Sequence, residues 1–149
     1  MVWAEVDDVL NRAANGIAAH LDRRAADAPR RVAVFAENAV ETALAHLGGL
    51  LAGASTVPVN FHLTADESAY ILADSRTQML FVGAETAERG LEAARQAGVD
   101  TVVGWHCEGI DGITDWHEWL GGNAASELSL DITPLPNLLY TSGTTGLPK

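Results

Sequence analysis

Short apolar runs alternate with helix-like segments along most of the chain, and this alternation limits the possible folds more than any other feature. The apolar runs predict strands at residues 32–36, 55–59, 78–82, 99–105 and 137–140. Apolar residues at helical spacing predict helices at about 5–23, 38–53, 64–72 and 85–97, and a short helix around 116–120. Strands that alternate with helices predict an α/β layered fold with a largely parallel sheet and flanking helices.

Helix-start and helix-stop signals support these boundaries. Asn38 with Glu41, and Thr64 with Glu67, have the spacing of capping boxes. Gly53 suits the carboxyl end of the second helix. Each signal therefore predicts a helix end at the point where an apolar run begins or stops.

Two other groups of residues are predicted to serve packing. Gly48 and Gly49 lie inside the second helix, where glycine costs helix propensity but lets another backbone come close. Trp105, Trp116 and Trp119 are expected to pack beneath a long connection.

Length and composition exclude several classes of protein. The 149 residues contain no linker or repeat and are long enough for one domain with a sizeable core. A net charge of −11 without a basic stripe argues against nucleic-acid binding. Residues 42–65, the longest low-charge stretch, contain glycines and a proline, and they predict a helix and a strand, not a transmembrane segment. The acidic N-terminus argues against a secretory signal, and the single cysteine fits a reducing compartment.

Histidine and cysteine side chains do not form a convincing site. His106, Cys107 and His117 are the nearest thing to a cluster, but their spacing fits no common zinc pattern. Cys107 has no lysine or arginine close in sequence to lower its pKa, so it is a weak candidate nucleophile.

The last ten residues, YTSGTTGLPK, combine three features that suit a polyphosphate. Gly143 and Gly146 let backbone N–H groups approach a phosphate without a Cβ in the way. Lys149, the only lysine in the chain, adds a positive charge. Hydroxyl donors come from Thr141, Ser142, Thr144 and Thr145. Because ligands of parallel sheets bind beyond the carboxyl ends of strands, we expect the loop to lie at such an end, after the predicted strand at 137–140.

Clusters of serine, threonine and glycine are more often ordinary surface turns than phosphate sites. Here the preceding apolar run and the following Pro148-Lys149 favour the phosphate interpretation. The loop is not a Walker A sequence, which needs Gly-Lys-Ser/Thr in succession. Nor is it a dinucleotide fingerprint, because a third glycine and an adjoining helix are lacking.

TSGTTGLPK at 141–149 resembles the phosphate-binding signature of the adenylate-forming superfamily. This superfamily contains acyl-CoA synthetases, aryl-CoA ligases, luciferases and peptide-synthetase adenylation domains. Residues 4–82 are also similar to the first part of these enzymes, whereas the similarity is weak between 83 and 137. Thr144-Thr145 and the Pro-Val-Asn at 58–60 look most like fatty or aryl acyl-CoA synthetases.

The resemblance implies that residues 1–149 are the first portion of a large N-terminal AMP-binding domain. The complete enzyme would be an ATP-dependent acid–thiol ligase of fatty acid metabolism. It would activate a carboxylic acid as acyl-AMP and transfer the acyl group to CoA, so its partners are small molecules. The implied location is the cytoplasm, with peripheral membrane contact as a further option. The implied phosphate ligands are Thr141, Ser142, Gly143, Thr144, Thr145, Gly146 and Lys149, with Thr141 also a ligand of Mg²⁺.

Four alternatives stay open at this stage. They are an acyl-AMP ligase, a peptide-synthetase adenylation domain, a stand-alone nucleotide-binding module and a truncated pseudo-enzyme. The family's later motifs, its hinge and the small C-terminal domain with its catalytic lysine are missing from the 149 residues. We therefore expect a fragment that is inactive alone, has a mobile final loop and self-associates through an exposed strand edge and apolar faces.

Overall fold

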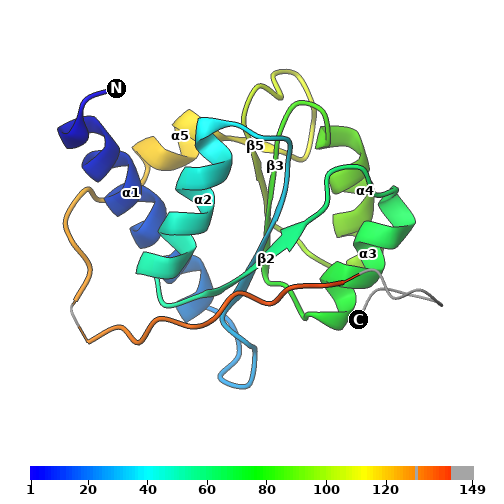
Figure 1. Ribbon diagram of the computed structural model, residues 1–149, viewed down its shortest axis with the longest axis horizontal. Helices are drawn as coiled ribbons and strands as arrows, with labels where there is room; N and C mark the ends of the chain where they lie inside the picture. The colour runs from blue at the N-terminus through cyan, green and yellow to red at the C-terminus, as the bar shows by residue number, and fades with distance from the viewer. Residues whose placement is uncertain (130, 142–149) are drawn as a thin grey trace.

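A computed structural model describes residues 1–129 and 131–141 and contains one five-stranded sheet (Figure 1). Across the sheet the order is β2-β1-β3-β4-β5, and every neighbouring pair is parallel. The strands are β1 (Arg31–Phe35), β2 (Ser55–Val59), β3 (Met79–Val82), β4 (Val102–Gly104) and β5 (Thr114–Asp115). The predicted α/β fold with a parallel sheet is confirmed.

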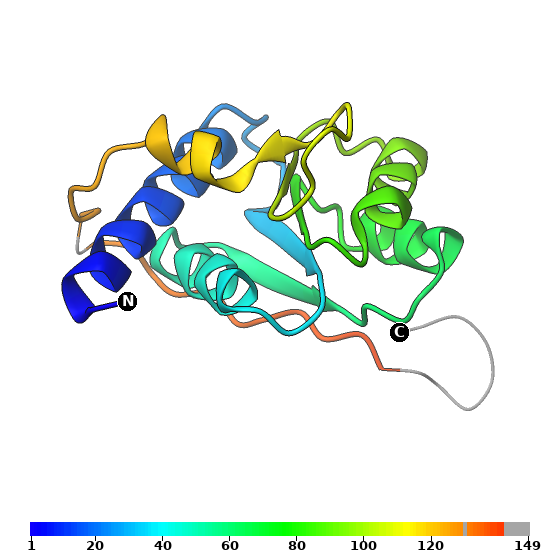
Figure 2. The same ribbon diagram turned by 90° about the horizontal axis from the view of Figure 1, so that it is seen from above.

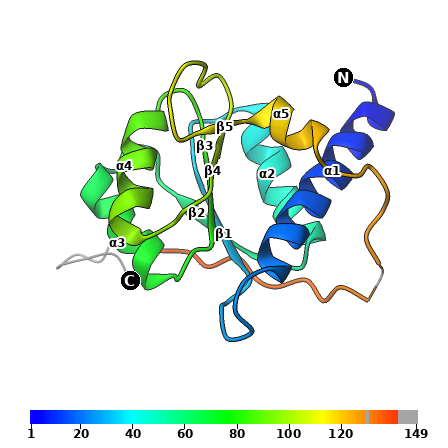
Figure 3. The same ribbon diagram turned by 180° about the vertical axis from the view of Figure 1, so that it is seen from behind.

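Helices cover both faces of the sheet, as the views from above and from behind show (Figures 2 and 3). One face carries α1 (Trp3–Asp22), α2 (Val40–Leu51) and α5 (Trp116–Gly121), and the other carries α3 (Ala65–Asp74) and α4 (Ala87–Ala97). Alternate residues of β1, β3 and β4 serve the two cores, which is why these strands read as continuous apolar runs. No helix in the described part of the chain is long and apolar enough to span a bilayer.

One of the two predicted capping boxes is present. The Glu67 N–H donates to Thr64 Oγ1 at 3.3 Å, and the Thr64 N–H donates to the Glu67 carboxylate at 2.8 Å. The box at Asn38 is wrong, because α2 begins one residue later with Ala39 as its N-cap. Alanine has no side-chain acceptor, so α2 starts without the bond that the sequence predicts.

Glycines let α2 pack closely against its neighbours. A Cβ on Gly48 would lie 2.8 Å from the Cβ of Ala13 in α1, and a Cβ on Gly49 would lie 2.5 Å from Thr56 Cγ2 in β2. Gly53 follows the helix with a φ of 67°, in the left-handed region that glycine adopts at no steric cost. The predicted close approach and the predicted helix end are both confirmed.

The predicted strand at 137–140 is wrong. This part of the chain runs along the free edge of β2 in the same direction as the strand, yet it is not a strand (Figure 1). The Leu138 N–H donates to the Thr56 carbonyl at 2.9 Å. A longer parallel ladder through this bond would also need N–H donors at 58 and 136, and both residues are proline. Pro58 and Pro136 therefore restrict the pairing of this segment with β2.

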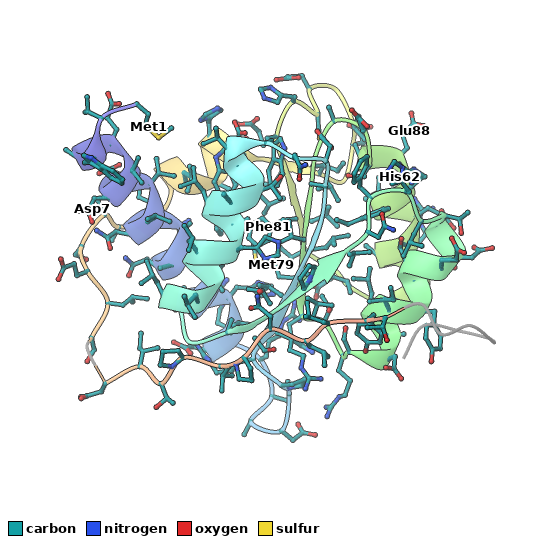
Figure 4. The ribbon with its side chains drawn as sticks, in the orientation of Figure 1. Met1, Asp7, His62, Met79, Phe81 and Glu88 are labelled. Atoms are coloured by element: carbon teal, nitrogen blue, oxygen red, sulfur yellow. The ribbon has the colours of Figure 1, made fainter. Side chains whose placement is uncertain are left out.

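Aromatic rings fill the core between the sheet and α5, and the predicted packing role of the tryptophans is confirmed. Trp105 and Trp116 are each 1% exposed, and their ring centroids are 5.7 Å apart. Phe81 lies edge-on to Trp116 at 6.0 Å and to Trp119 at 5.4 Å. Figure 4 shows Met79 and Phe81 pointing from β3 to the side of the sheet that α2 covers.

Stability is expected to fall in mild acid because of His20. Its side chain is buried, with Nε2 2.9 Å from the Gln78 carbonyl and 2.9 Å from Arg24 Nη2. Burial lowers the pKa of His20, and the charge of Arg24 lowers it further. Because the folded pKa lies below the unfolded value near 6.5, the unfolded state takes up this proton first, and stability is lost as the pH falls through that value.

Thermal denaturation followed by circular dichroism between about pH 5 and 7 tests this expectation. The variant His20→Gln should have a shallower dependence of Tm on pH than the parent chain. His62→Gln changes an exposed histidine and should leave the slope unchanged. Equal slopes in all three proteins would contradict the assignment to His20.

Candidate functional site

The segment that leads to the predicted phosphate loop is fastened to the start of β2. The Ser55 hydroxyl donates to the Pro136 carbonyl at 2.6 Å, and the Thr56 hydroxyl donates to Asn137 Oδ1, also at 2.6 Å. Together with the Leu138 N–H bond, these contacts fix the segment beside the amino-terminal half of the edge strand.

Tyr140 fastens the far end of the segment to α3. Its hydroxyl donates to the carboxylate of Asp74, the last residue of α3, at 2.6 Å. Burial raises the pKa of Tyr140 to about 12, and the bond to Asp74 contributes to the rise, so the hydroxyl stays protonated as a donor. Thr141, the next residue, is exposed. The fold therefore leaves Thr141 exposed to solvent, directly after a residue whose hydroxyl is bonded to the carboxyl end of α3.

Of the predicted phosphate ligands, only Thr141 is in the described part of the chain. The other predicted ligands lie outside it: Ser142, Gly143, Thr144, Thr145, Gly146 and Lys149. The expectation that the loop is mobile also concerns residues outside the described part. Within residues 1–129 and 131–141, no group of three or more His, Cys, Asp and Glu side chains could hold a metal ion. The Thr141 hydroxyl is an oxygen ligand of the kind that Mg²⁺ accepts, but phosphate oxygens or water would have to complete the shell.

Carboxylates lie at the carboxyl ends of the strands, where parallel α/β folds commonly bind ligands. The strand order reverses between β1 and β3, and Glu37 and Gly83 follow these two strands. A Cβ on Gly83 would collide with the Glu37 carboxylate, so this carboxylate lies directly against the backbone there. Glu41 is also close by, 3.8 Å from His106. Negative charge at this end of the sheet disfavours phosphate. Because residues 137–140 do not form a strand, the expectation that the loop follows a strand of this sheet is wrong.

Cys107 and the nearby histidines do not form a reactive cluster. Cys107 is buried, and its thiol donates to the Trp105 carbonyl at 3.1 Å. Burial raises the pKa of Cys107 to about 11, with the charges of Glu108 and Glu37 adding to the rise. At neutral pH this thiol is protonated, whereas a nucleophile needs a thiolate. His106 and His117 are exposed.

The side chains that hold the segment in place were missed by sequence reasoning. They are Ser55, Thr56, Asn137 and Tyr140. The available signal was the polar pair at the start of an otherwise apolar strand, because hydroxyls on an edge strand can bond an adjacent segment. Nothing local in the sequence connects this pair with a segment about eighty residues further along, as the Ser55–Pro136 bond does.

Three hollows in the described part of the surface lie away from Thr141. One of about 250 Å³ is lined by Arg24, Arg76, Gln78 and Asp100, among others. A second, of about 460 Å³, lies between α1, α2 and residues 127–129, 132 and 134, and a third of about 470 Å³ adjoins it. Thr141 lines none of the three.

Comparison with known proteins identifies the family. Residues 3–149 match the family described as AMP-binding enzyme, and the match includes the loop at 141–149. The chain therefore belongs to the AMP-binding enzymes.

Two curated relatives indicate which members it is similar to. It is 36% identical over 154 residues to the long-chain-fatty-acid–CoA ligase FadD13 of Mycobacterium tuberculosis, with 100% of this chain and 28% of the ligase covered. It is 33% identical over 140 residues to surfactin synthase subunit 3 of Bacillus subtilis, covering 94% of this chain and 10% of that subunit.

A solved structure agrees with the fold. The inhibitor-bound N-terminal domain of FACL13 from Mycobacterium tuberculosis superposes with a TM-score of 0.77 at 33% identity. The alignment covers 100% of this chain and 36% of that structure. The chain thus spans about a third or less of the proteins it matches.

Proposed function

We propose that residues 1–149 form the first portion of the large AMP-binding domain of an acyl-CoA synthetase, and that residues 141–149 bind the phosphates of ATP. The complete enzyme would activate a fatty acid as acyl-AMP, release pyrophosphate and transfer the acyl group to CoA. The observation that carries the proposal is the family match that runs through the TSGTTGLPK loop. The 36% identity to a fatty-acid–CoA ligase supports the choice of substrate class.

Each part of the loop has a task in this reaction. When the acid's carboxylate attacks the α-phosphate, negative charge builds up on the departing pyrophosphate. Lys149 would neutralise part of this charge, and backbone N–H groups at Gly143 and Gly146 would hold the phosphates in line. Thr141 would ligate Mg²⁺, which supplies further charge neutralisation when bound. Fastening of the preceding segment through Tyr140 and Asp74 would fix where the loop begins.

Replacing Lys149 tests the proposed role of the loop. In an enzyme whose chain continues past Lys149 through the remaining domains, Lys149→Ala should slow the adenylation half-reaction about tenfold or more. The later thioester step should change less, because pyrophosphate has already left. Fatty-acid-dependent ATP–pyrophosphate exchange measures the first step, and acyl-CoA formation from supplied acyl-AMP measures the second.

Arg95→Ala is the matched control, because it removes an exposed cation on α4 that pairs with Glu92. It should leave both steps unchanged. An exchange rate for Lys149→Ala within about twofold of the parent enzyme would rule out the proposed role of Lys149.

An amino-acid substrate is the second candidate, favoured by the 33% identity to surfactin synthase subunit 3. Exchange assays with fatty acids, aryl acids and amino acids as competing substrates would separate the two. Activity with amino acids alone would replace the acyl-CoA synthetase proposal by an adenylation domain of a peptide synthetase. For a fatty-acid enzyme we propose a cytoplasmic location with peripheral membrane contact, which fractionation of cells would test.

A further inference from the structure

Asp74 occupies a position that the electrostatics of its own helix disfavour. It is the last residue of α3, and the last turn of this helix contains no basic residue. Carbonyl groups at the carboxyl end of a helix carry partial negative charge, so a carboxylate there is unfavourable unless another group engages it. The Tyr140 hydroxyl is such a group, and it comes from 66 residues further along the chain. A residue that violates a local preference and bonds a distant segment indicates a task outside its own helix.

The end of α3 is a fixed support for this bond. Ile71 and Leu72, in the last turn of the helix, are 2% and 1% exposed and belong to the core between the sheet and helices α3 and α4. Ser75 directly after the helix is buried, and its carbonyl accepts a bond from Arg31 Nη1 at 2.7 Å. Core packing and this bond therefore hold the Asp74 carboxylate in place.

Tyr140 is held at both ends of its side chain. The side chain packs against the same core, and its hydroxyl donates to Asp74 at 2.6 Å. A tyrosine side chain has only two torsions, so these two contacts leave its backbone little freedom. Thr141 follows directly, and Figure 1 shows the segment reaching α3 at this point. The contact with Asp74 thus determines where residues 141–149 begin.

We propose that Asp74 is a positioning residue for ATP, because through Tyr140 it fixes the start of the loop at 141–149. The inference rests on the proposed function, since it requires this loop to bind the phosphates of ATP. A loop with a fixed start spends more of its time in binding-competent positions, and the apparent affinity for a ligand is proportional to that fraction. Loss of the Asp74–Tyr140 bond therefore raises the KM for ATP and changes turnover at saturating ATP much less.

The kinetics of fatty-acid-dependent ATP–pyrophosphate exchange test this role in an enzyme whose chain continues past Lys149. Asp74→Ala and Tyr140→Phe should each raise the KM for ATP about three- to tenfold, the effect of one lost hydrogen bond. The maximal exchange rate and the KM for the fatty acid should stay within about twofold of the parent values. Asp74→Asn keeps an oxygen that can accept the bond, so it should restore most of the affinity that Asp74→Ala loses.

The double variant Asp74→Ala/Tyr140→Phe should be no weaker than either single variant, because all three lack the same bond. Tyr70→Phe is the matched control, since it makes the same chemical change one turn before Asp74 in α3. It should leave the KM for ATP unchanged.

A second measurement needs no nucleotide. The Leu138 N–H bonds the Thr56 carbonyl two residues before Tyr140, so its hydrogen exchange reports how firmly the segment is held. This exchange should be about two- to tenfold faster in Tyr140→Phe than in the parent enzyme. It should be unchanged in Tyr70→Phe.

Three results would overturn the role of Asp74. If Lys149→Ala slows exchange while Asp74→Ala and Tyr140→Phe keep a KM for ATP within about 1.5-fold of the parent, the proposed function stands without this role. Equal rises in the KM for ATP and for the fatty acid would show that the variants act through the stability of the fold. No effect of Lys149→Ala would overturn the proposed function and, with it, the role of Asp74.

Discussion

Trp116→Ala should remove about 3–5 kcal/mol from the free energy of unfolding, a large share of the roughly 5–15 kcal/mol that is typical of folded domains. The side chain is 1% exposed at the first residue of α5, and its ring contacts those of Trp105, Trp119 and Phe81. These rings are rigid, so they cannot collapse into the space that the indole leaves. The lost transfer energy is therefore joined by the energy of a cavity.

Urea denaturation followed by circular dichroism measures the loss. Trp3→Ala is the matched control, because Trp3 is 87% exposed and the chemical change is the same. Its cost should stay within about 0.5 kcal/mol. Equal losses for the two variants would show that the aromatic cluster does not anchor α5.

Gly49→Ala should destabilise the chain by about 1–3 kcal/mol, although alanine is the better helix former by about 1 kcal/mol. The new Cβ would lie 2.5 Å from Thr56 Cγ2 and 3.4 Å from Val32 Cγ2. Both of these atoms belong to β-branched side chains in the sheet, which have little freedom to turn away. The helix must shift outward, and the contacts of α2 with β1 and β2 weaken.

The control variant Gly121→Ala separates the effect of packing from the effect of helix propensity. It changes another helical glycine, but a Cβ there would meet nothing within 4 Å. The substitution should be neutral or stabilising by up to about 1 kcal/mol. The sign of the two effects in thermal denaturation is decisive, because stabilisation by Gly49→Ala would mean that α2 does not press on the sheet.

Features governed by local chemistry could be predicted from the sequence. The Thr64–Glu67 capping box needs only residues three apart, and the buried strands need only a short apolar run. Gly53 needs only the end of its own helix. In each case the residues that cause the structural feature are close together in the sequence, so the sequence pattern alone predicts it.

Features that depend on distant residues could not be predicted. Residues 137–140 are apolar enough for a strand, but Pro58, far earlier in the chain, restricts their pairing with β2. Strand β5 has two residues and exists only because β4 is beside it. Asn38 carries the right side chain for a cap, yet the path of the chain out of β1 starts α2 one residue later.

The candidate site also has one part that could be predicted from the sequence and another that could not. The order of residues in TSGTTGLPK indicated the family, because the residue types that suit phosphate binding are neighbours in the sequence. The place where the segment before it meets the sheet depends on Ser55, Thr56, Asn137 and Tyr140, which no local pattern connects. All of the predicted phosphate ligands, Thr141 included, remain predictions.

The mode of attachment of residues 136–140 has a mechanical consequence. Four hydrogen bonds hold them, and three are made by side chains at the surface of β2 and α3. Hydrogen bonds of this kind contribute about 0.5–1.5 kcal/mol each, and Leu138 and Tyr140 also pack against the core between the sheet and α3 and α4. Detaching residues 136–140 would break these contacts and leave the five paired strands intact. Displacement of residues 136–140 would therefore leave the backbone pairing of the five strands unchanged.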